Sequence, residues 1–220
     1  MTGIKSIIII EDHPVMRHGL AAYFEKTGWQ INGTASSLKE ARKLFRQVSS
    51  SEGADIVLLD IQLDDGWGLD IITWLQSFLD EKNAIASQNH PGAPHHNLMP
   101  LMAVYSTFED YAHVSAALSL GVKVYITKRR SEQELETALL KALKGDIIVD
   151  EAARIKLDNT TNVLNLLTKR EAELLNLVKT GLSNIQIANK LGISRRTVEN
   201  ILSCVYDKTD IRSRLELERL

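Results

Sequence analysis

Four short apolar runs, each followed within two residues by a polar side chain, restrict the fold of this chain more than any other feature. The runs are Ile7–Ile10, Ile56–Leu59, Leu101–Tyr105 and Val124–Ile126. Uninterrupted apolar runs of this length are typical of strands buried on both faces of a parallel sheet. A weaker run over residues 30–34 predicts a fifth strand nearer an edge.

Five amphipathic stretches alternate with these runs and predict helices over 14–26, 38–48, 69–79, 108–120 and 132–143. Two of them begin with the capping-box pattern, Ser37 with Glu40 and Ser131 with Glu134, in which two side chains satisfy free backbone N–H groups. Strands that alternate with helices build parallel βαβ units. The sequence therefore predicts a doubly wound, flavodoxin-like α/β domain with a five-stranded parallel sheet.

The chain changes character after residue 144. Residues 145–162 show little periodicity and are predicted to be a linker, with at most a short helix over 151–155. Beyond them the strand pattern disappears, and Thr168, Ser183 and Ser194 stand where helix caps are expected. We therefore predict an α/β domain over 1–144 and an all-α domain over 163–220.

The segment 80–100 is long for a connection between a helix and a strand. Its three histidines, His90, His95 and His96, are candidates for a transition-metal site. They have neither a regular helical spacing nor a carboxylate partner. We therefore expect a mobile, solvated insertion that binds no metal.

Charge is divided unevenly between the two parts. Residues 1–150 contain 14 Lys/Arg and 19 Asp/Glu, a balance of −5, whereas residues 163–220 contain 10 and 7, a balance of +3. The basic part is a candidate for binding nucleic acid. The single cysteine, Cys204, cannot form an internal disulfide, and no segment has the pattern of a membrane span or a signal peptide. These features predict a cytoplasmic protein.

The polar side chains that follow the apolar runs are Glu11 and Asp12, Asp60, Ser106 and Lys128. Ligands of doubly wound sheets bind beyond the carboxyl ends of the strands, so we expect these side chains to converge. Three carboxylates at one point repel each other unless a cation joins them. Because oxygen ligands suit Mg²⁺, the sequence predicts a magnesium site at Glu11, Asp12 and Asp60.

A carboxylate in such a site can attack a phosphoryl donor and form an acyl phosphate. We predict that Asp60 is the nucleophile. The Lys128 ammonium would offset charge on the transferred group, and Ser106 would donate a hydrogen bond to it. The alternative is that Asp60 only caps a turn.

Residues 4–144 resemble the receiver domain of two-component response regulators. The resemblance is carried by Ile10-Glu11-Asp12, Leu59-Asp60, Gly68, Tyr105-Ser106, Gly121 and Tyr125-Ile126-Thr127-Lys128. It implies that a sensor histidine kinase supplies the phosphoryl group and that the backbone carbonyl of Gln62 joins the magnesium ligands. It also implies that Tyr125 turns inward when Ser106 binds the phosphoryl group. The alternative is that Tyr125 is an ordinary core aromatic. Asp64 and Arg129 depart from the residues common in the family, which bears on the lifetime of the phosphorylated state.

Residues 184–203 fit a helix-turn-helix. Such a motif needs a small residue where its helices approach, a Gly in the turn and an apolar anchor on the second helix, and Ala188, Gly192 and Val198 occupy these places. This part resembles the DNA-binding domain of LuxR-type regulators through Leu167–Glu171, Gly181–Asn184, Ile187-Ala188, Leu191–Ser194, Thr197–Asn200, Asp207-Lys208 and Ser213-Arg214. With the receiver resemblance, it points to the NarL/FixJ class of response regulators.

The second helix of this motif is expected to enter the major groove of DNA. The predicted DNA-binding residues are Lys190, Arg195, Arg196, Thr197, Glu199, Asn200, Ser203 and Lys208. The four basic residues are expected to contact phosphates, and Glu199, Asn200 and Ser203 are expected to face bases. The alternative for Glu199 is a salt bridge with Arg195 or Arg196. Cys204 is expected to be a small packed residue.

The sequence thus predicts a transcription factor in which phosphorylation of Asp60 controls homodimerisation and sequence-specific binding to double-stranded DNA, with no membrane partner. It is not expected to be an enzyme beyond assisting its own phosphorylation and dephosphorylation. Two alternatives stay open: a constitutive DNA-binding regulator with an inactive receiver, and an aspartyl-phosphate phosphohydrolase. The second needs an acid–base carboxylate two residues after the nucleophile, where this chain has Gln62.

Overall fold

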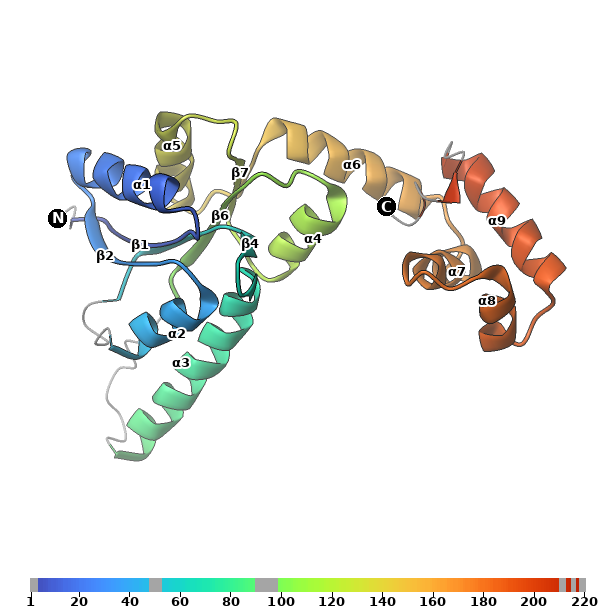
Figure 1. The fold of residues 1–220 in the computed structure, drawn as a ribbon, viewed down its shortest axis with the longest axis horizontal. Coiled ribbons are helices and arrows are strands. Elements are labelled where there is room, and N and C mark those ends of the chain that lie inside the picture. The colour runs from blue at the N-terminus through green and yellow to red at the C-terminus, as the bar shows by residue number, and fades with distance from the viewer. Residues whose placement is uncertain (1–3, 48–52, 90–98, 210–212, 215–216, 218–220) are drawn as a thin grey trace. The chain divides into compact units, whose positions relative to one another are not determined.

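The computed structural model describes residues 4–47, 53–89, 99–209, 213–214 and 217, so His90, His95 and His96 lie outside the described residues. The chain forms two compact units, and the main change from one to the other falls at Glu151–Ala152 (Figure 1). Within the described residues, no helix is both long enough and apolar enough to cross a membrane.

The first unit is built on a parallel sheet of six strands in the order β2-β1-β3-β6-β7-β8. The strands are β1 (Ser6–Ile10), β2 (Gln30–Ala35), β3 (Ile56–Leu59), β6 (Leu101–Ser106), β7 (Val124–Thr127) and β8 (Ile148–Val149). The doubly wound fold is confirmed, but the sheet has one strand more than the predicted five. The extra strand, β8, has only two residues, which is too short for an alternating pattern to reveal it.

Helices cover both faces of this sheet. They are α1 (Pro14–Lys26), α2 (Leu38–Gln47), α3 (Asp70–Asn89), α4 (Tyr111–Ser119) and α5 (Glu132–Ala142). Figure 1 shows α1 and α5 on one side of the sheet and α2 and α3 on the other. The capping box of Ser131 and Glu134 is present. At α2 it is incomplete, because the Glu40 carboxylate accepts from Ser36 instead of Ser37.

Helix α3 is longer than predicted. The expected end at residue 79 and the expected loop from residue 80 are wrong, because the helix continues to Asn89. Residues 80–89 contain neither Pro nor Gly, the residues that most disfavour a helix. One turn beyond Phe78, the Lys82 ammonium lies 4.9 Å from the centroid of its ring.

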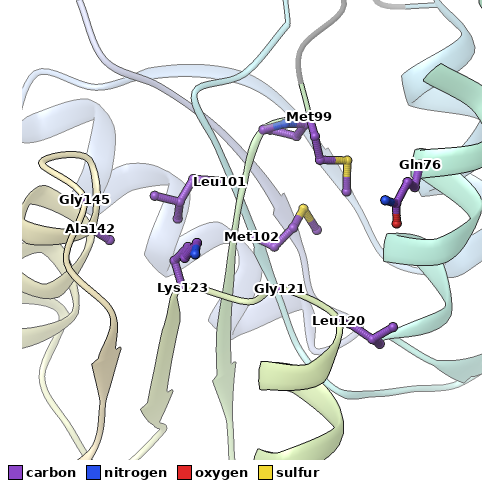
Figure 2. A pocket seen from close by; sticks show the side chains of 10 residues that line it. Gln76, Met99, Leu101, Met102, Leu120, Gly121, Lys123, Ala142 and Gly145 are labelled. Carbon is purple, nitrogen blue, oxygen red and sulfur yellow. The ribbon is translucent and has the colours of Figure 1, made fainter. Parts of the chain in front are cut away.

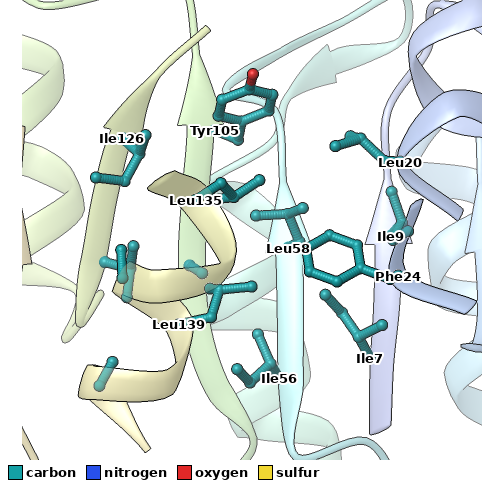
Figure 3. Close-up of a cluster of buried hydrophobic side chains, with 14 of the residues drawn as sticks. Ile7, Ile9, Leu20, Phe24, Ile56, Leu58, Tyr105, Ile126, Leu135 and Leu139 are labelled. Atoms are coloured by element: carbon teal, nitrogen blue, oxygen red, sulfur yellow. The ribbon is translucent and has the colours of Figure 1, made fainter. Parts of the chain in front are cut away.

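The core between the sheet, α1 and α5 fixes the strands that carry the polar cluster (Figure 3). Ile7 and Ile9 on β1 and Ile56 and Leu58 on β3 point into it, because alternate residues of a strand face the same side. Phe24 of α1 is fully buried in this cluster. The labelled contributors are Ile7, Ile9, Leu20, Phe24, Ile56, Leu58, Tyr105, Ile126, Leu135 and Leu139.

A small antiparallel hairpin follows the end of β3 and was not predicted. It pairs β4 (Gln62–Leu63) with β5 (Gly66–Trp67). Asp65 in its turn accepts hydrogen bonds from the backbone N–H groups of Leu38 and Lys39, at 2.8 and 3.0 Å, and so caps α2. Strands of only two residues each are too short to show the alternation of apolar and polar residues by which a strand is predicted.

The segment expected to be a linker carries regular structure. Residues 145–162 contain β8 and most of α6 (Glu151–Asn165). The expected helix over 151–155 is therefore the first part of a longer one. Asn159, Thr160 and Thr161 have low helix propensity, which explains why the sequence pattern did not predict its full length.

The second unit contains α7 (Lys169–Lys179), α8 (Asn184–Leu191) and α9 (Arg195–Thr209). Complete capping boxes open α7 at Thr168 and α8 at Ser183, as predicted. Gly192 ends α8 with φ of 64°, a left-handed conformation that favours glycine. The three helices pack on a shared core of Leu174, Leu175, Val178, Ile187, Ala188, Val198, Leu202, Val205 and Leu217.

Candidate functional site

Glu11 and Asp60 lie at the same end of two neighbouring strands. Glu11 follows β1 and Asp60 follows β3, and these strands pair in parallel. Strand β1 stands between β2 and β3. The chain therefore adds β2 on one side of β1 and β3 on the other side. Such a switch point leaves a crevice at the carboxyl ends of the strands. The predicted convergence is therefore built by the strand order.

Lys128 joins these two carboxylates. Its Nζ lies 2.7 Å from Oε2 of Glu11 and 2.6 Å from Oδ2 of Asp60. Glu11 and Asp60 are 2% and 6% exposed, so the pairing takes place largely out of water. A buried carboxylate needs such a partner, because an unpaired charge in this setting is costly.

The second oxygen of Asp60 is also held. Ser106 Oγ donates a hydrogen bond to Oδ1 at 2.7 Å, and the backbone N–H of Gln62 donates to it at 3.4 Å. Ser106 is fully buried at the end of β6. Three donors from three different segments therefore fix the orientation of the Asp60 carboxylate.

Asp12 lies beside this group and faces His13. The Asp12 Oδ1 atom lies 2.8 Å from Nδ1 of His13. Glu11, Asp12 and His13 each offer one ligand atom for a metal ion, and these three atoms lie within 4.8 Å of one another. Among the described residues, Asp60 is not part of this group and meets Glu11 through Lys128. The carboxylates of Glu11 and Asp12 offer oxygen ligands of the kind that Mg²⁺ prefers.

Two pKa shifts follow from this packing. Burial raises the pKa of the Glu11 carboxyl, although the hydrogen bond from Lys128 opposes the shift. Burial alone would lower the pKa of Lys128, but its hydrogen bonds to Asp60 and Glu11 outweigh burial and raise that pKa. Lys128 is therefore a permanent cation between two acidic groups at neutral pH.

Tyr125 points into the protein. It is fully buried, and its hydroxyl donates to the backbone carbonyl of Phe108 at 2.9 Å. The Phe108 ring stacks on His113, with centroids 4.2 Å apart, and His113 stacks on Trp67 at 4.9 Å. This aromatic stack, which was not predicted, links the hairpin after Asp60 to helix α4.

A second polar network anchors the loop after Lys128. Asp150 is 4% exposed and accepts from Thr127 Oγ1 at 2.7 Å. It also accepts from Nε and Nη2 of Arg130, at 3.1 and 3.2 Å. The hydroxyl of Tyr105 donates to the backbone carbonyl of Arg130 at 2.8 Å. Sequence reasoning missed this network because Asp150 follows the unpredicted strand β8.

A pocket lies at the amino ends of the strands, near the start of β6 and opposite the carboxylate cluster (Figure 2). Its lining includes Met99, Leu101, Met102 and Leu120. Lys123 is the one titratable side chain among the residues that line it. We assign no chemistry to this pocket, in contrast to the carboxyl ends of the strands.

The predicted DNA-binding side chains lie on α8 and α9, with Lys208 in the last turn of α9. Ser194 caps α9, because its Oγ accepts from the N–H of Thr197 at 3.1 Å. Lys208 is exposed, and so are the other predicted residues on these helices: Lys190, Arg195, Arg196, Thr197, Glu199, Asn200 and Ser203. These seven lie at the end of α8 and in the first nine residues of α9. They therefore lie on the surface of the helix-turn-helix.

Three of the predicted residues form ion pairs within the unit. Arg195 Nε lies 2.7 Å from Oε1 of Glu199, which is the salt bridge given as the alternative for Glu199. Lys208 Nζ lies 2.7 Å from Oε2 of Glu171, the capping residue of α7. Cys204 is exposed, so the expectation that it is packed is wrong. It lies on the outer face of α9, opposite the core.

Comparison with known proteins gives matches to both units. The profile described as "Response regulator receiver domain" matches residues 7–90, and the one described as "Bacterial regulatory proteins, luxR family" matches residues 165–220. The response regulator protein VraR of Staphylococcus aureus (strain NCTC 8325 / PS 47) is 25% identical over 215 residues, covering 96% of this chain and 92% of VraR.

Solved structures of similar fold include the response regulator RcsB of Salmonella typhimurium. It has a TM-score of 0.68 at 20% identity and covers 97% of both chains. A two-component response regulator RcsB–DNA complex has a TM-score of 0.67 at 19% identity, covering 98% of this chain and 96% of that chain. At this identity the likeness shows the fold.

Proposed function

The chain belongs to the two-component response regulators that join a receiver domain to a LuxR-type DNA-binding domain, and we propose that phosphorylation of Asp60 controls its binding to DNA. The observation that carries this proposal is the triple contact of Asp60 with Ser106, Lys128 and the N–H of Gln62. Each of these groups is a donor directed at the carboxylate that would carry the phosphoryl group.

In this proposal Asp60 attacks the phosphorus of a phosphohistidine on a sensor histidine kinase. A new O–P bond forms as the P–N bond breaks, and the electron pair of that bond leaves with the imidazole. Lys128 and Ser106 then donate to oxygens of the transferred group in place of the carboxylate oxygens they hold now. These donors stabilise the charge that spreads over the phosphoryl oxygens.

Mg²⁺, when bound, would neutralise charge between the phosphoryl group and the carboxylates. Glu11, Asp12, Asp60 and the backbone carbonyl of Gln62 would hold it. The carboxylates offer the oxygen ligands that this ion prefers, and Mg²⁺ accepts a site with few protein ligands because it keeps several waters.

The direct test is to incubate the full chain with acetyl phosphate and Mg²⁺ and to locate the phosphoryl group by mass spectrometry. We expect labelling at Asp60, and none there in Asp60→Asn, because the amide has the same shape but is a poor nucleophile. Labelling of the Asn variant at the same site would refute the assignment. The circular dichroism spectrum of the variant should match that of the parent.

For the second unit, we propose that α9 enters the major groove of DNA. Arg195, Arg196 and Lys190 would contact phosphates, while Asn200 and Ser203 would face bases together with Glu199. Lys208 donates to Glu171, so we assign it to stabilising the unit. A solved structure of two RcsB dimers bound to two parallel DNAs supports the proposal that this chain also binds DNA as a homodimer.

Two alternatives have less support. A constitutive regulator with an inactive receiver would need none of the contacts around Asp60 to be intact, yet all of them are present. A phosphohydrolase would need a carboxylate at the position of Gln62. Gel filtration and DNA binding with beryllofluoride and Mg²⁺ separate the cases, because only the phosphorylation switch predicts a change in both.

A further inference from the structure

Arg17 holds the loop that carries the two acidic residues. It lies in the first part of α1, and its Nη1 donates to the backbone carbonyls of Glu11 and Asp12, at 2.6 and 3.0 Å. The residue before α1, His13, makes no side-chain cap. Arg17 therefore supplies a contact to the loop that the usual capping chemistry does not.

The place of this guanidinium is electrostatically unfavourable in two ways. A cation near the start of a helix opposes the helix dipole. A cation beside Glu11 and Asp12 also repels any divalent ion that these carboxylates would hold. Attraction to the Glu11 and Asp12 carboxylates opposes both costs, so charge alone does not explain the arginine. Its two hydrogen bonds to the loop carbonyls are the specific contacts that it adds.

We propose that Arg17 is a positioning residue for Mg²⁺: it fixes the backbone from which the Glu11 and Asp12 side chains project. This inference rests on the proposed function, in which these residues are magnesium ligands. Partners that orient metal ligands typically change metal affinity by 10–100-fold when they are removed. Arg17 would act in this way through the backbone, without touching the ion.

A positioning role and a purely electrostatic role of Arg17 predict opposite changes in Mg²⁺ affinity when Arg17 is replaced, which makes the proposal testable. Arg17→Met removes the charge and both hydrogen bonds at similar length. Arg17→Lys keeps the charge but reaches less far, so it weakens the two hydrogen bonds that the single atom Nη1 makes. If Arg17 acts through its charge alone, Mg²⁺ should bind Arg17→Met more tightly. If Arg17 positions the loop, Mg²⁺ should bind Arg17→Met about tenfold more weakly, with Arg17→Lys in between.

The experiment is isothermal titration of the full chain with MgCl₂ at fixed ionic strength. Arg46→Met is the matched control, because Arg46 is an exposed arginine on α2 whose ring contact is with Trp74. It should change the Mg²⁺ dissociation constant less than twofold. Unchanged or tighter binding by Arg17→Met would overturn the inference.

A second measurement keeps the inference testable if Arg17→Met is poorly folded. Hydrogen exchange of the Asp12 and His13 amides in Arg17→Lys, without Mg²⁺, should be several-fold faster than in the parent while the β1 amides are unchanged. Equal exchange rates would argue against the positioning role. Failure of the proposed function would give a different result. The parent would then either bind no Mg²⁺ or bind it as well as Asp12→Ala does.

Discussion

The Nζ atom of Lys128 lies 2.6 Å from Oδ2 of Asp60, and the two residues come from strands that do not pair with each other. Strand β6 separates β3 from β7, so Lys128 reaches across the end of β6 to meet the acceptor. The same ammonium lies 2.7 Å from Glu11. It therefore lies between two carboxylates that follow two different strands and offsets part of their charge.

Replacing Lys128 with Met should slow phosphorylation of Asp60 and strengthen Mg²⁺ binding. The cation that stabilises charge on the transferred group would be gone, which costs roughly 100-fold in rate for one lost donor of this kind. Removing Lys128 also removes a cation that repels Mg²⁺, an effect that a further rise of the Glu11 pKa only partly offsets. The initial rate of labelling by acetyl phosphate at saturating Mg²⁺ measures the first effect, and calorimetric titration measures the second. An undiminished rate would exclude Lys128 from the reaction.

Gly68→Ala should disturb Asp60 directly. A Cβ atom added at Gly68 would lie 1.8 Å from the backbone carbonyl oxygen of Asp60, so the acceptor backbone has to move. We expect phosphorylation to fall at least tenfold, in line with the sensitivity of catalysis to small misplacements. Gly19→Ala is the control, since nothing lies within 4 Å of its added Cβ. A phosphorylation rate in Gly68→Ala equal to that of Gly19→Ala would contradict this account.

The Glu171–Lys208 pair should make the second unit sensitive to acid. The hydrogen bond from Lys208 lowers the pKa of Glu171 below its ordinary value of 4.5. A carboxyl with a lowered pKa stabilises the fold fully above its unfolded pKa and loses that contribution as the pH falls through the folded pKa. The stability advantage of the parent over Glu171→Gln should therefore shrink below about pH 4.5. Urea unfolding of both chains between pH 7 and pH 3 measures the difference, and a constant difference would count against the pair.

Glu199→Lys should show whether this residue reads a base or only pairs with Arg195. The variant loses the 2.7 Å contact to Arg195 Nε and adds a cation near the DNA backbone, so nonspecific binding should rise. If Glu199 also accepts from a base edge, the preferred sequence should change at one base pair, by roughly 1–3 kcal/mol. Selection of binding sites from random duplexes measures this. The same preferred sequence for both proteins would leave the salt bridge as its role.

The apolar runs predicted the strands well because a buried parallel strand tolerates few polar residues. Once the strand order was implied, the convergence of Glu11, Asp60 and Lys128 followed from geometry, since parallel strands end at the same edge. The contacts of Arg17 could not be predicted in this way. Any polar residue in the first turns of α1 satisfies the same sequence pattern, and only the path of the loop shows which carbonyls it meets.

The parts that were wrong or missed share a physical reason. Strands β4, β5 and β8 have two residues each, and their stability comes from neighbours that are distant in sequence. The salt bridge of Lys208 with Glu171 joins residues 37 positions apart, so helical spacing could not reveal it. Sequence patterns report local order, whereas these features depend on tertiary contacts.

Strand β8 sets a limit on how the receiver unit can be cut from the chain. A fragment ending at residue 144 would remove β8, which is the partner of β7 on its outer side in the part of the chain that the structure describes. It would also remove Asp150. The Thr127 hydroxyl and the Arg130 guanidinium would then lose their shared acceptor. An unpaired strand edge is a template for another chain. Such a fragment should self-associate edge to edge, and that artefact could be mistaken for a dimer induced by phosphorylation.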